Sequence, residues 1–344
     1  MDASRPGTTA AGSTARLWLV PFAMLCLVRS GIAADDTSPV AVVDTMERNF
    51  GAHPGQRRNH TKGVCAAGSF TATRDAARLS RSPVFSGSTV PVIARFSIAG
   101  GRPNMPDAAR NPRGMALRFE LPGGGQHMMA MLHTPVFGVA TPAAFLENLQ
   151  AATPDPATGK PDPEKLKAFA AAHPEARTQA DFLRNNNPPA SYASTPYYSL
   201  HAFRLVDRAG HGHYVRWRFE PQDGTHFLEN DALAAMPQDF LEARLKERMA
   251  KGPVKWDMIV TFAEAGDTLV DPTVAWPAGR KEQKVGTLEL TRATAQAGGD
   301  CEKINFDPML LSDGVEASDD PVLRFRPGAY AVSFGRRLSD AAAR

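Results

Sequence analysis

One tyrosine near the end of the chain lies between two arginines at spacings that could support chemistry. Arg326 precedes Tyr330 by four residues and Arg337 follows it by seven. If residues 329–337 form a short helix, Arg326 lies at or just before its start, and one helical turn brings it to the side of Tyr330. A neighbouring cation favours the phenolate form of a tyrosine, and a phenolate can ligate ferric haem iron. The alternative interpretation is a surface helix with a half-buried tyrosine and solvated arginines.

A second candidate group lies near the start of the chain, in a basic segment bordered by glycine. His60 follows Arg57 by three residues, a spacing that turns both side chains toward one surface in a turning segment. A single histidine is more often structural than catalytic. Because nothing in this segment suggests an apolar core, we keep His60 as a candidate for proton transfer.

Residues 90–99, VPVIARFSIA, predict a β-strand because β-branched and aromatic residues are bounded by proline and glycine. Strand alternation places Arg95 and Ser97 on one face, and Ala94, Phe96 and Ile98 on the other. If the Arg95 face is buried, its polar groups need partners. A haem propionate and an imidazole N–H would serve, and the alternative is a solvent-exposed face.

Other residues that often bind metals give weaker patterns. His211 and His213 flank a predicted turn and lack a third ligand, and the chain has no C-x-x-C sequence. We therefore expect no zinc site. Cys65 and Cys301 could pair in an oxidising compartment, but their separation in sequence does not give their distance.

The elements that must position these residues are mostly strands. Helices are expected at 40–49, from 141 or 142 to 150, and at 231–251, with two short surface helices within 155–187. Strands are expected at 90–99, 114–121, 126–137, 200–206, 213–220, 254–263 and 285–292. This order predicts an α+β chain whose antiparallel sheet is long enough to curl into a closed barrel, with inserted helices and a C-terminal helix.

Composition excludes some classes of function. Of the 344 residues, 43% are hydrophobic and 22% are charged, as in soluble globular proteins. The net charge is only +3 and no block of Lys and Arg is present, so we expect no nucleic-acid partner.

The first residues resemble a secretory signal. Arg5 and Arg16 precede an apolar run at 17–28, which is too short to span a bilayer comfortably, and small residues follow near Ala33. The sequence predicts a signal peptide over 1–33 and an exported, periplasmic protein without stable membrane insertion after cleavage. An uncleaved anchor is the alternative.

Several collinear motifs resemble the haem catalase family, and in particular its short catalase-related peroxidases. The resemblance runs from about residue 50 to residue 338, nearly the whole chain after the predicted signal, and predicts a single catalase-like haem domain over 34–344. The matching stretches are Arg57-x-x-His60-x-Lys62-Gly63, Ala94-Arg95-Phe96-Ser97, Asn111-Pro112-Arg113-Gly114-Met115-Ala116, Thr134-Pro135-Val136-Phe137, Tyr198-Ser199-x-His201-x-Phe203-x-Leu205-Val206, Thr273-Val274-x-Trp276-Pro277, Gly286-x-Leu288-x-Leu290, Phe306-Asp307-Pro308 and Arg326-x-x-x-Tyr330-x-x-Ser333.

The resemblance implies haem b in an antiparallel β-barrel and assigns expected roles by matching position. Tyr330 would be the proximal iron ligand, with Arg326 keeping it a phenolate. His60 would be the distal base, held by Ser97. The expected partners of the haem itself are Arg57, Arg95 and Arg337 for the propionates and Phe145 for the haem face.

Two departures from the family are visible. His133 stands where we expect the distal asparagine of typical catalases, just before Thr134, and whether it faces the iron is open. The chain also ends shortly after the proximal motif, without the C-terminal helical region of full catalases, and lacks most of their N-terminal arm. Both departures favour peroxidase turnover with a small donor over fast catalase turnover.

The resulting expectation is a peroxidase that reduces hydrogen peroxide or small organic hydroperoxides with a small organic reductant, as a monomer or small homo-oligomer. Two alternatives remain. One is a lyase or dehydratase of the catalase fold that acts on fatty-acid hydroperoxides. The other is a haem-binding barrel without turnover, which would not need His60 and Ser97.

Overall fold

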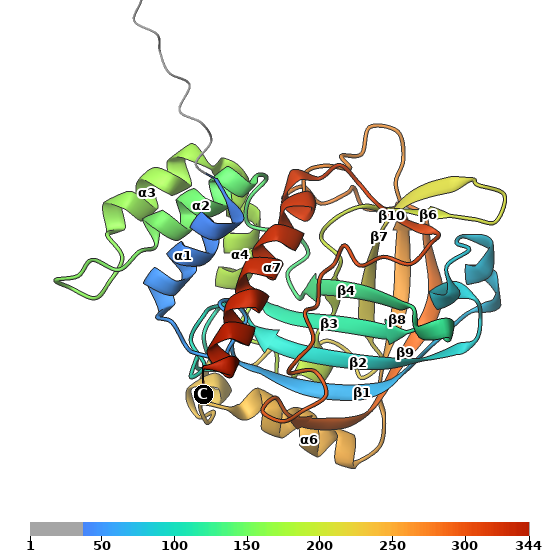
Figure 1. Ribbon diagram of the computed structural model, residues 1–344, viewed down its shortest axis with the longest axis horizontal. Helices are drawn as coiled ribbons and strands as arrows, with labels where there is room; N and C mark the ends of the chain where they lie inside the picture. Colours follow the sequence, from blue (N-terminus) through green and yellow to red (C-terminus); the bar gives the residue numbers. More distant parts are fainter. Residues whose placement is uncertain (1–36, 344) are drawn as a thin grey trace, which may run out of the picture. The chain divides into compact units, whose positions relative to one another are not determined.

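The computed structural model describes residues 37–343 of the chain, and in them ten strands form one antiparallel sheet (Figure 1). Their order is β10-β6-β7-β5-β4-β3-β2-β1-β9-β8, and an additional β7–β8 pairing closes eight of the ten strands into a barrel. The strands are β1 (Gly63–Ala72), β2 (Thr89–Ile98), β3 (Arg113–Glu120), β4 (Gln126–Leu132), β5 (Tyr197–Tyr198), β6 (Phe203–Val206), β7 (Gly212–Pro221), β8 (Val254–Phe262), β9 (Glu282–Ala295) and β10 (Val315–Ala317). The predicted α+β barrel is confirmed.

Side chains fill the interior of the barrel. Phe70 packs edge-on against Phe119 with ring centroids 5.5 Å apart, and the ring centroids of Phe96 and Trp256 are 5.7 Å apart. All four side chains are fully buried in one large apolar cluster. A barrel of this size is closed by its own side chains, so a cavity for a large ligand must lie outside this core.

The helices gather mainly around one side of the sheet. They are α1 (Pro39–Phe50), α2 (Pro142–Ala151), α3 (Pro163–Ala172), α4 (Arg177–Asn185), α5 (Asn230–Ala234), α6 (Phe240–Ala250) and α7 (Pro321–Ala342). Val42 and Met46 of α1 pack with Leu146 of α2 in a second apolar cluster, against which Phe325 of α7 also packs. Figure 1 shows α7 running between α1 and the barrel strands.

Two predicted strands are shorter than the sequence suggested. The strand predicted at 126–137 ends at Leu132, and the one predicted to begin at residue 200 begins at Phe203. Leu200 has a φ of 66°, a left-handed backbone conformation that a strand does not accommodate. The strand from Thr89 to Ile98 is as predicted, with Ala94 and Phe96 facing the core.

Two helix predictions were wrong in their bounds. The helix predicted over 231–251 is two helices, α5 and α6, separated by a segment that contains Pro237. Helix α7 begins at Pro321, well before the predicted start, because Asp320 caps it by accepting from the amides of Val322 and Leu323. It continues through Pro327 to Ala342.

A disulfide joins Cys65 of β1 to Cys301 in the segment after β9, with Cα atoms 5.3 Å apart. The sequence had left this pairing open. In the part of the chain that the structure describes, no helix is long and apolar enough to cross a membrane. The predicted signal peptide lies outside the described residues.

Candidate active site

A cavity of about 430 Å³ lies beside the barrel core, where α1, α2 and α7 cover strands β2–β4. Arg95 and Ser97 of β2 line it, on the face of the strand opposite Phe96. The expected haem pocket thus lies against the outer face of the barrel and not in its packed interior. All eight sequence-predicted site residues line this one cavity: Arg57, His60, Arg95, Ser97, Phe145, Arg326, Tyr330 and Arg337.

Three neighbours fix the position of His60. Its Nδ1 lies 2.9 Å from the Ser97 hydroxyl, and its backbone N–H donates to Asn59 Oδ1 at 2.8 Å. His60 has a φ of 52°, which is uncommon for a residue other than glycine and is held here by these contacts. Gly114 completes the arrangement, because a Cβ there would lie 2.9 Å from Ser97 Oγ and 3.2 Å from the His60 ring.

The environment of His60 favours its neutral form. Burial lowers its pKa to about 3, and the positive charges of Arg95, Arg326 and Arg57 add to this effect. In the neutral tautomer whose Nδ1–H donates to the Ser97 hydroxyl oxygen, Nε2 has a lone pair that can accept a proton. This is the state that a general base requires.

Tyr330 ends a hydrogen-bonded chain that runs back to the start of its own helix. Arg326 Nη2 donates to the Tyr330 hydroxyl oxygen at 2.7 Å, and Arg326 Nη1 donates to His201 Nε2 at 3.2 Å. His201 Nδ1 lies 2.6 Å from Asp320 Oδ2. A guanidinium carries only hydrogen-bond donors, so Nε2 of His201 must be the acceptor of the bond from Arg326. His201 therefore carries its proton on Nδ1 and donates it to Asp320. The chain therefore directs a guanidinium at the phenol oxygen.

Arg57, Arg95 and Arg337 converge without a carboxylate partner. In the described part of the chain none of the three forms an ion pair. Arg57 Nη2 donates to the carbonyl oxygens of Cys301 and Ile304 at 3.0 and 2.7 Å, and Arg95 Nε donates to Gln296 Oε1 at 2.8 Å. Burial lowers the pKa of Arg57, as do the charges of the other two arginines.

These features fit a haem group. Arg95 and Arg337 are buried and Arg57 is partly buried, and none of them has an acidic partner among the described residues. Such a cluster of guanidiniums favours anionic ligands, which two propionates would supply. Arg337 Nη1, for example, is buried and has no hydrogen-bond partner among the described residues. Tyr330 offers the oxygen that ferric iron accepts.

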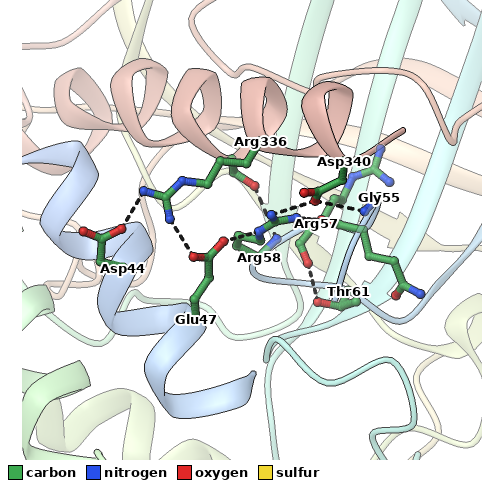
Figure 2. Close-up of polar contacts among 10 residues, drawn as sticks. Asp44, Glu47, Gly55, Arg57, Arg58, Thr61, Arg336 and Asp340 are labelled. Atoms are coloured by element: carbon green, nitrogen blue, oxygen red, sulfur yellow. Dashed lines mark hydrogen bonds and ion pairs between the residues drawn. The ribbon is translucent and has the colours of Figure 1, made fainter. Parts of the chain in front are cut away.

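An ion-pair network joins the helix that carries Tyr330 to the segment that carries Arg57 and His60 (Figure 2). Arg58 pairs with Glu47 of α1 at 2.5 Å and with Asp340 of α7 at 2.8 Å. Its side chain is only 5% exposed. The network therefore fixes α1, α7 and the segment before β1 against one another.

Arg336 extends the network along the surface. It pairs with Glu47 at 2.7 Å and with Asp44 at 2.5 Å, and these contacts join α7 to α1 a second time. Figure 2 shows both arginines meeting Glu47 from different sides.

His133 points away from the cavity, which answers the question that the sequence left open. Its Nδ1 accepts from the backbone N–H of Arg113 at 3.0 Å, and its ring lies edge-on to Phe182 with centroids 5.6 Å apart. Burial and the charge of Arg113 lower its pKa to about 3. Leu132, the preceding residue, lines the cavity instead, so this point of the wall is apolar.

Sequence reasoning missed four residues that hold the site. Asn59 and Gly114 support His60, and His201 and Asp320 support Arg326. The motifs around Gly114 and His201 could have signalled these two, because both lie in stretches that resemble the catalase family. Nothing in the sequence alone marks the contact of His201 with Asp320, which lies 119 residues away.

Comparison with known proteins gives a family that agrees with this geometry. The family profile described as Catalase matches residues 38–343. A catalase-related peroxidase of Synechococcus elongatus is 52% identical over 93% of this chain and 96% of its own length. One of Mycolicibacterium paratuberculosis is 38% identical over 86% of this chain and 93% of its own.

Solved structures agree in fold. A fungal catalase superposes with a TM-score of 0.76 at 26% identity, and catalase A of Saccharomyces cerevisiae with 0.76 at 27%. Each match covers 82% of this chain but only 60% and 61% of the catalase chains, so the chain spans about three fifths of their length. The chain belongs to the catalase family.

Proposed function

We propose that the chain is a haem-dependent peroxidase that reduces hydrogen peroxide or small organic hydroperoxides with an organic electron donor. The observation that carries the proposal is that the wall of one cavity holds a neutral histidine, a tyrosine faced by a guanidinium, and three arginines without acidic partners among the described residues. Two relatives that match over 96% and 93% of their own length are named catalase-related peroxidases.

In this proposal Tyr330 and the three arginines hold the prosthetic group. The hydroxyl oxygen of Tyr330 would ligate the iron, and the hydrogen bond from Arg326 favours negative charge on that oxygen. Arg57, Arg95 and Arg337 would bind the propionates. Phe145, whose ring centroid lies 5.9 Å from that of Phe137, would pack against the haem. When bound, haem would supply the two electrons that reduce the peroxide.

His60 moves the proton. Its Nε2 accepts a proton from one peroxide oxygen and returns it to the other, which then leaves as water. Ser97 and Gly114 keep the ring in position for both transfers. Because burial keeps His60 neutral, the base is available without prior loss of a proton.

The apolar wall at Leu132 supports donor turnover over catalase turnover. The residues of β4 that line the cavity, Ala130, Met131 and Leu132, carry no side-chain hydrogen-bond donor, and His133 faces Phe182 and Arg113 instead. A second peroxide is therefore poorly oriented there, whereas an organic donor need only give up an electron and a proton.

A set of single variants tests the proposal. We expect the haem-loaded protein to consume peroxide with a phenolic donor, and His60→Gln to lower this rate by roughly 10²–10⁴-fold while keeping the haem. Tyr330→Phe should change the absorption of the bound haem. Haem binding without any peroxide-dependent donor oxidation in the unaltered protein would refute the proposal and favour a haem carrier.

We further propose that the protein is exported to an oxidising compartment and acts as a monomer or small homo-oligomer. The Cys65–Cys301 disulfide supports export, because such bonds persist outside the reducing cytosol. Sequencing the N-terminus of the purified mature protein tests the predicted cleavage after residue 33. Sedimentation of the haem-loaded protein tests the oligomeric state.

A further inference from the structure

A second cavity, of about 330 Å³, adjoins the first and shares Arg57 and Arg337 with it. The two arginines therefore form a common wall. The other side of the second cavity is built by the segment before β1, the start of α6 and the segment after β9. Gly55, Arg57 and Thr61, which line it, appear in Figure 2 beside the ion-pair network.

The rim of the second cavity is acidic. Asp239, Glu242 and Glu302 line it, together with one ammonium group, that of Lys62. Lys62 Nζ lies 2.8 Å from the buried carboxylate of Asp107 and 2.6 Å from Asp239, so its charge is shared between two carboxylates. The rim thus carries more negative than positive charge.

The common wall has spare hydrogen-bonding capacity. Arg337 is only 7% exposed, and its Nη1 is buried without a hydrogen-bond partner among the described residues. If the propionates of haem engage Arg57 and Arg337 as proposed, the excess positive charge of this wall is cancelled. The uncompensated charges of the second cavity are then mainly those of the carboxylates on its rim.

We infer that the second cavity is the docking site of the electron donor, and that it takes small neutral or cationic phenols and not anionic ones. This inference rests on the proposed function. A volume of about 330 Å³ suits an aromatic ring, and the carboxylates of the rim suit hydroxyl or amine groups that donate hydrogen bonds.

Docking there would let a donor reach the edge of the prosthetic group without entering the first cavity. The bound phenol contacts the same two guanidiniums that hold the propionates. Two phenols each lose one electron and one proton to hydrogen peroxide, which becomes two waters, and each phenol leaves as a phenoxyl radical.

Glu242 and Glu247 form a matched pair of test positions on α6. Each accepts an i,i+4 contact from a lysine, Lys246 at 2.6 Å and Lys251 at 2.9 Å, but only Glu242 lines the cavity. The probes are tyramine, a cationic phenol, and phenol-4-sulfonate, an anionic one. Dissociation constants are measured calorimetrically on the haem-loaded ferric protein without peroxide.

We expect Glu242→Lys to weaken tyramine binding by about fivefold or more at low salt, and to strengthen binding of phenol-4-sulfonate. Glu247→Lys should change neither. Glu242→Gln, a smaller change, should give a weaker effect of the same sign. The KM for tyramine should rise with its dissociation constant in Glu242→Lys, while Glu247→Lys leaves both unchanged.

Equal effects of Glu242→Lys and Glu247→Lys, or none from either, would overturn the inference. The two proposals fail separately. Tyramine binding that depends on Glu242 in a protein that consumes no peroxide would refute the peroxidase function alone. A rate of donor oxidation that is the same in Glu242→Lys and the unaltered protein would refute the docking site alone.

Discussion

At the scale of single residues, the site depends on close approach between His60, which precedes β1, and residues of two neighbouring strands. The ring of His60 lies against Ser97 of β2 and against Gly114 of β3, the residue paired with Ser97 in the sheet. A larger residue than glycine at 114 would occupy the space in which the His60–Ser97 hydrogen bond forms. Backbone register thus controls the geometry of the proposed base.

Replacing Gly114 with alanine tests this dependence. The new Cβ would lie 2.9 Å from Ser97 Oγ, so the hydroxyl must move and His60 loses its partner. We expect the rate of peroxide reduction to fall by roughly 100-fold, the lower end of what general acid–base catalysis contributes. Steady-state donor oxidation measures this rate.

Gly125→Ala is the matched control, because it lies in the connection between β3 and β4 and its Cβ would meet only ordinary contacts at 3.5 Å. Equal activity of the Gly114 and Gly125 variants would contradict the role given to Gly114.

The pH dependence of the reaction follows from His60. Its pKa is lowered to about 3 by burial and nearby arginines, so the base form dominates at every pH well above that value. We expect the rate of the reaction with peroxide to stay level as pH falls from 8 to about 5. A histidine with an ordinary pKa near 6.5 would instead lose most of its activity over this range.

Stopped-flow measurements at constant ionic strength test this expectation, with far-UV circular dichroism to check that the fold is intact at each pH. A tenfold fall in rate between pH 7 and pH 5, with the fold unchanged, would contradict it.

At the scale of elements, helix α7 connects the proposed iron ligand to the rest of the molecule. Tyr330 and Arg326 lie on it, Asp320 caps its start, and Arg336 and Asp340 near its end join the network around Arg58. The helix is therefore fixed at both ends. This arrangement holds the proposed proximal ligand rigidly against the cavity.

Arg58 and Arg336 allow the strength of this attachment to be measured. We expect Arg58→Ala to lower the free energy of unfolding by about 2–4 kcal/mol, because it removes two ion pairs made by a guanidinium that is only 5% exposed. Arg336→Ala should cost less than about 1 kcal/mol, because its contacts are closer to solvent.

Urea denaturation of both variants, haem-loaded and under identical conditions, gives the comparison. Equal losses of unfolding free energy in the two variants would show that Arg58 contributes no more to stability than Arg336.

Element boundaries show where sequence reasoning succeeded and where it did not. Alternation in Thr89–Ile98 gave the correct faces of Arg95 and Ser97, because that pattern is local. The start of α7 was missed because Pro327 and Gly328 disfavour a helix, whereas burial of Leu323 and the Asp320 cap stabilise it.

The contacts of His201 could not be predicted from the sequence for a different reason. They join residues 119 and 125 positions apart, and no periodicity encodes such a distance. Likewise, the motif resemblance pointed to eight residues that are among those lining the first cavity, but it did not reveal that Leu132 and not His133 faces it.

At the scale of the whole molecule, the Cys65–Cys301 disulfide links the barrel to the segment that supports the arginines. Cys301 and Ile304 offer the carbonyl oxygens that receive Arg57, and Cys301 lies 236 residues from Cys65 in the chain. The bond therefore stabilises the fold and holds one wall of the cavity in place.

Replacing both cysteines with serine tests this double role. We expect a loss of about 2–5 kcal/mol in the free energy of unfolding, since a long loop is no longer closed in the unfolded chain. Haem affinity should also fall, because the carbonyls that orient Arg57 are less well fixed. Thermal unfolding and haem titration measure the two effects, and unchanged values in both would contradict the role given to the bond.

The most direct test of the proposed function is a stopped-flow experiment on the mature, haem-loaded protein. It is mixed with hydrogen peroxide, with and without a phenolic donor, while haem absorption and oxygen release are followed together. We predict that peroxide changes the haem spectrum, that the resting spectrum returns slowly alone and quickly with the donor, and that little oxygen appears. Oxygen release without donor at a rate equal to donor oxidation would contradict this prediction and identify catalase turnover instead.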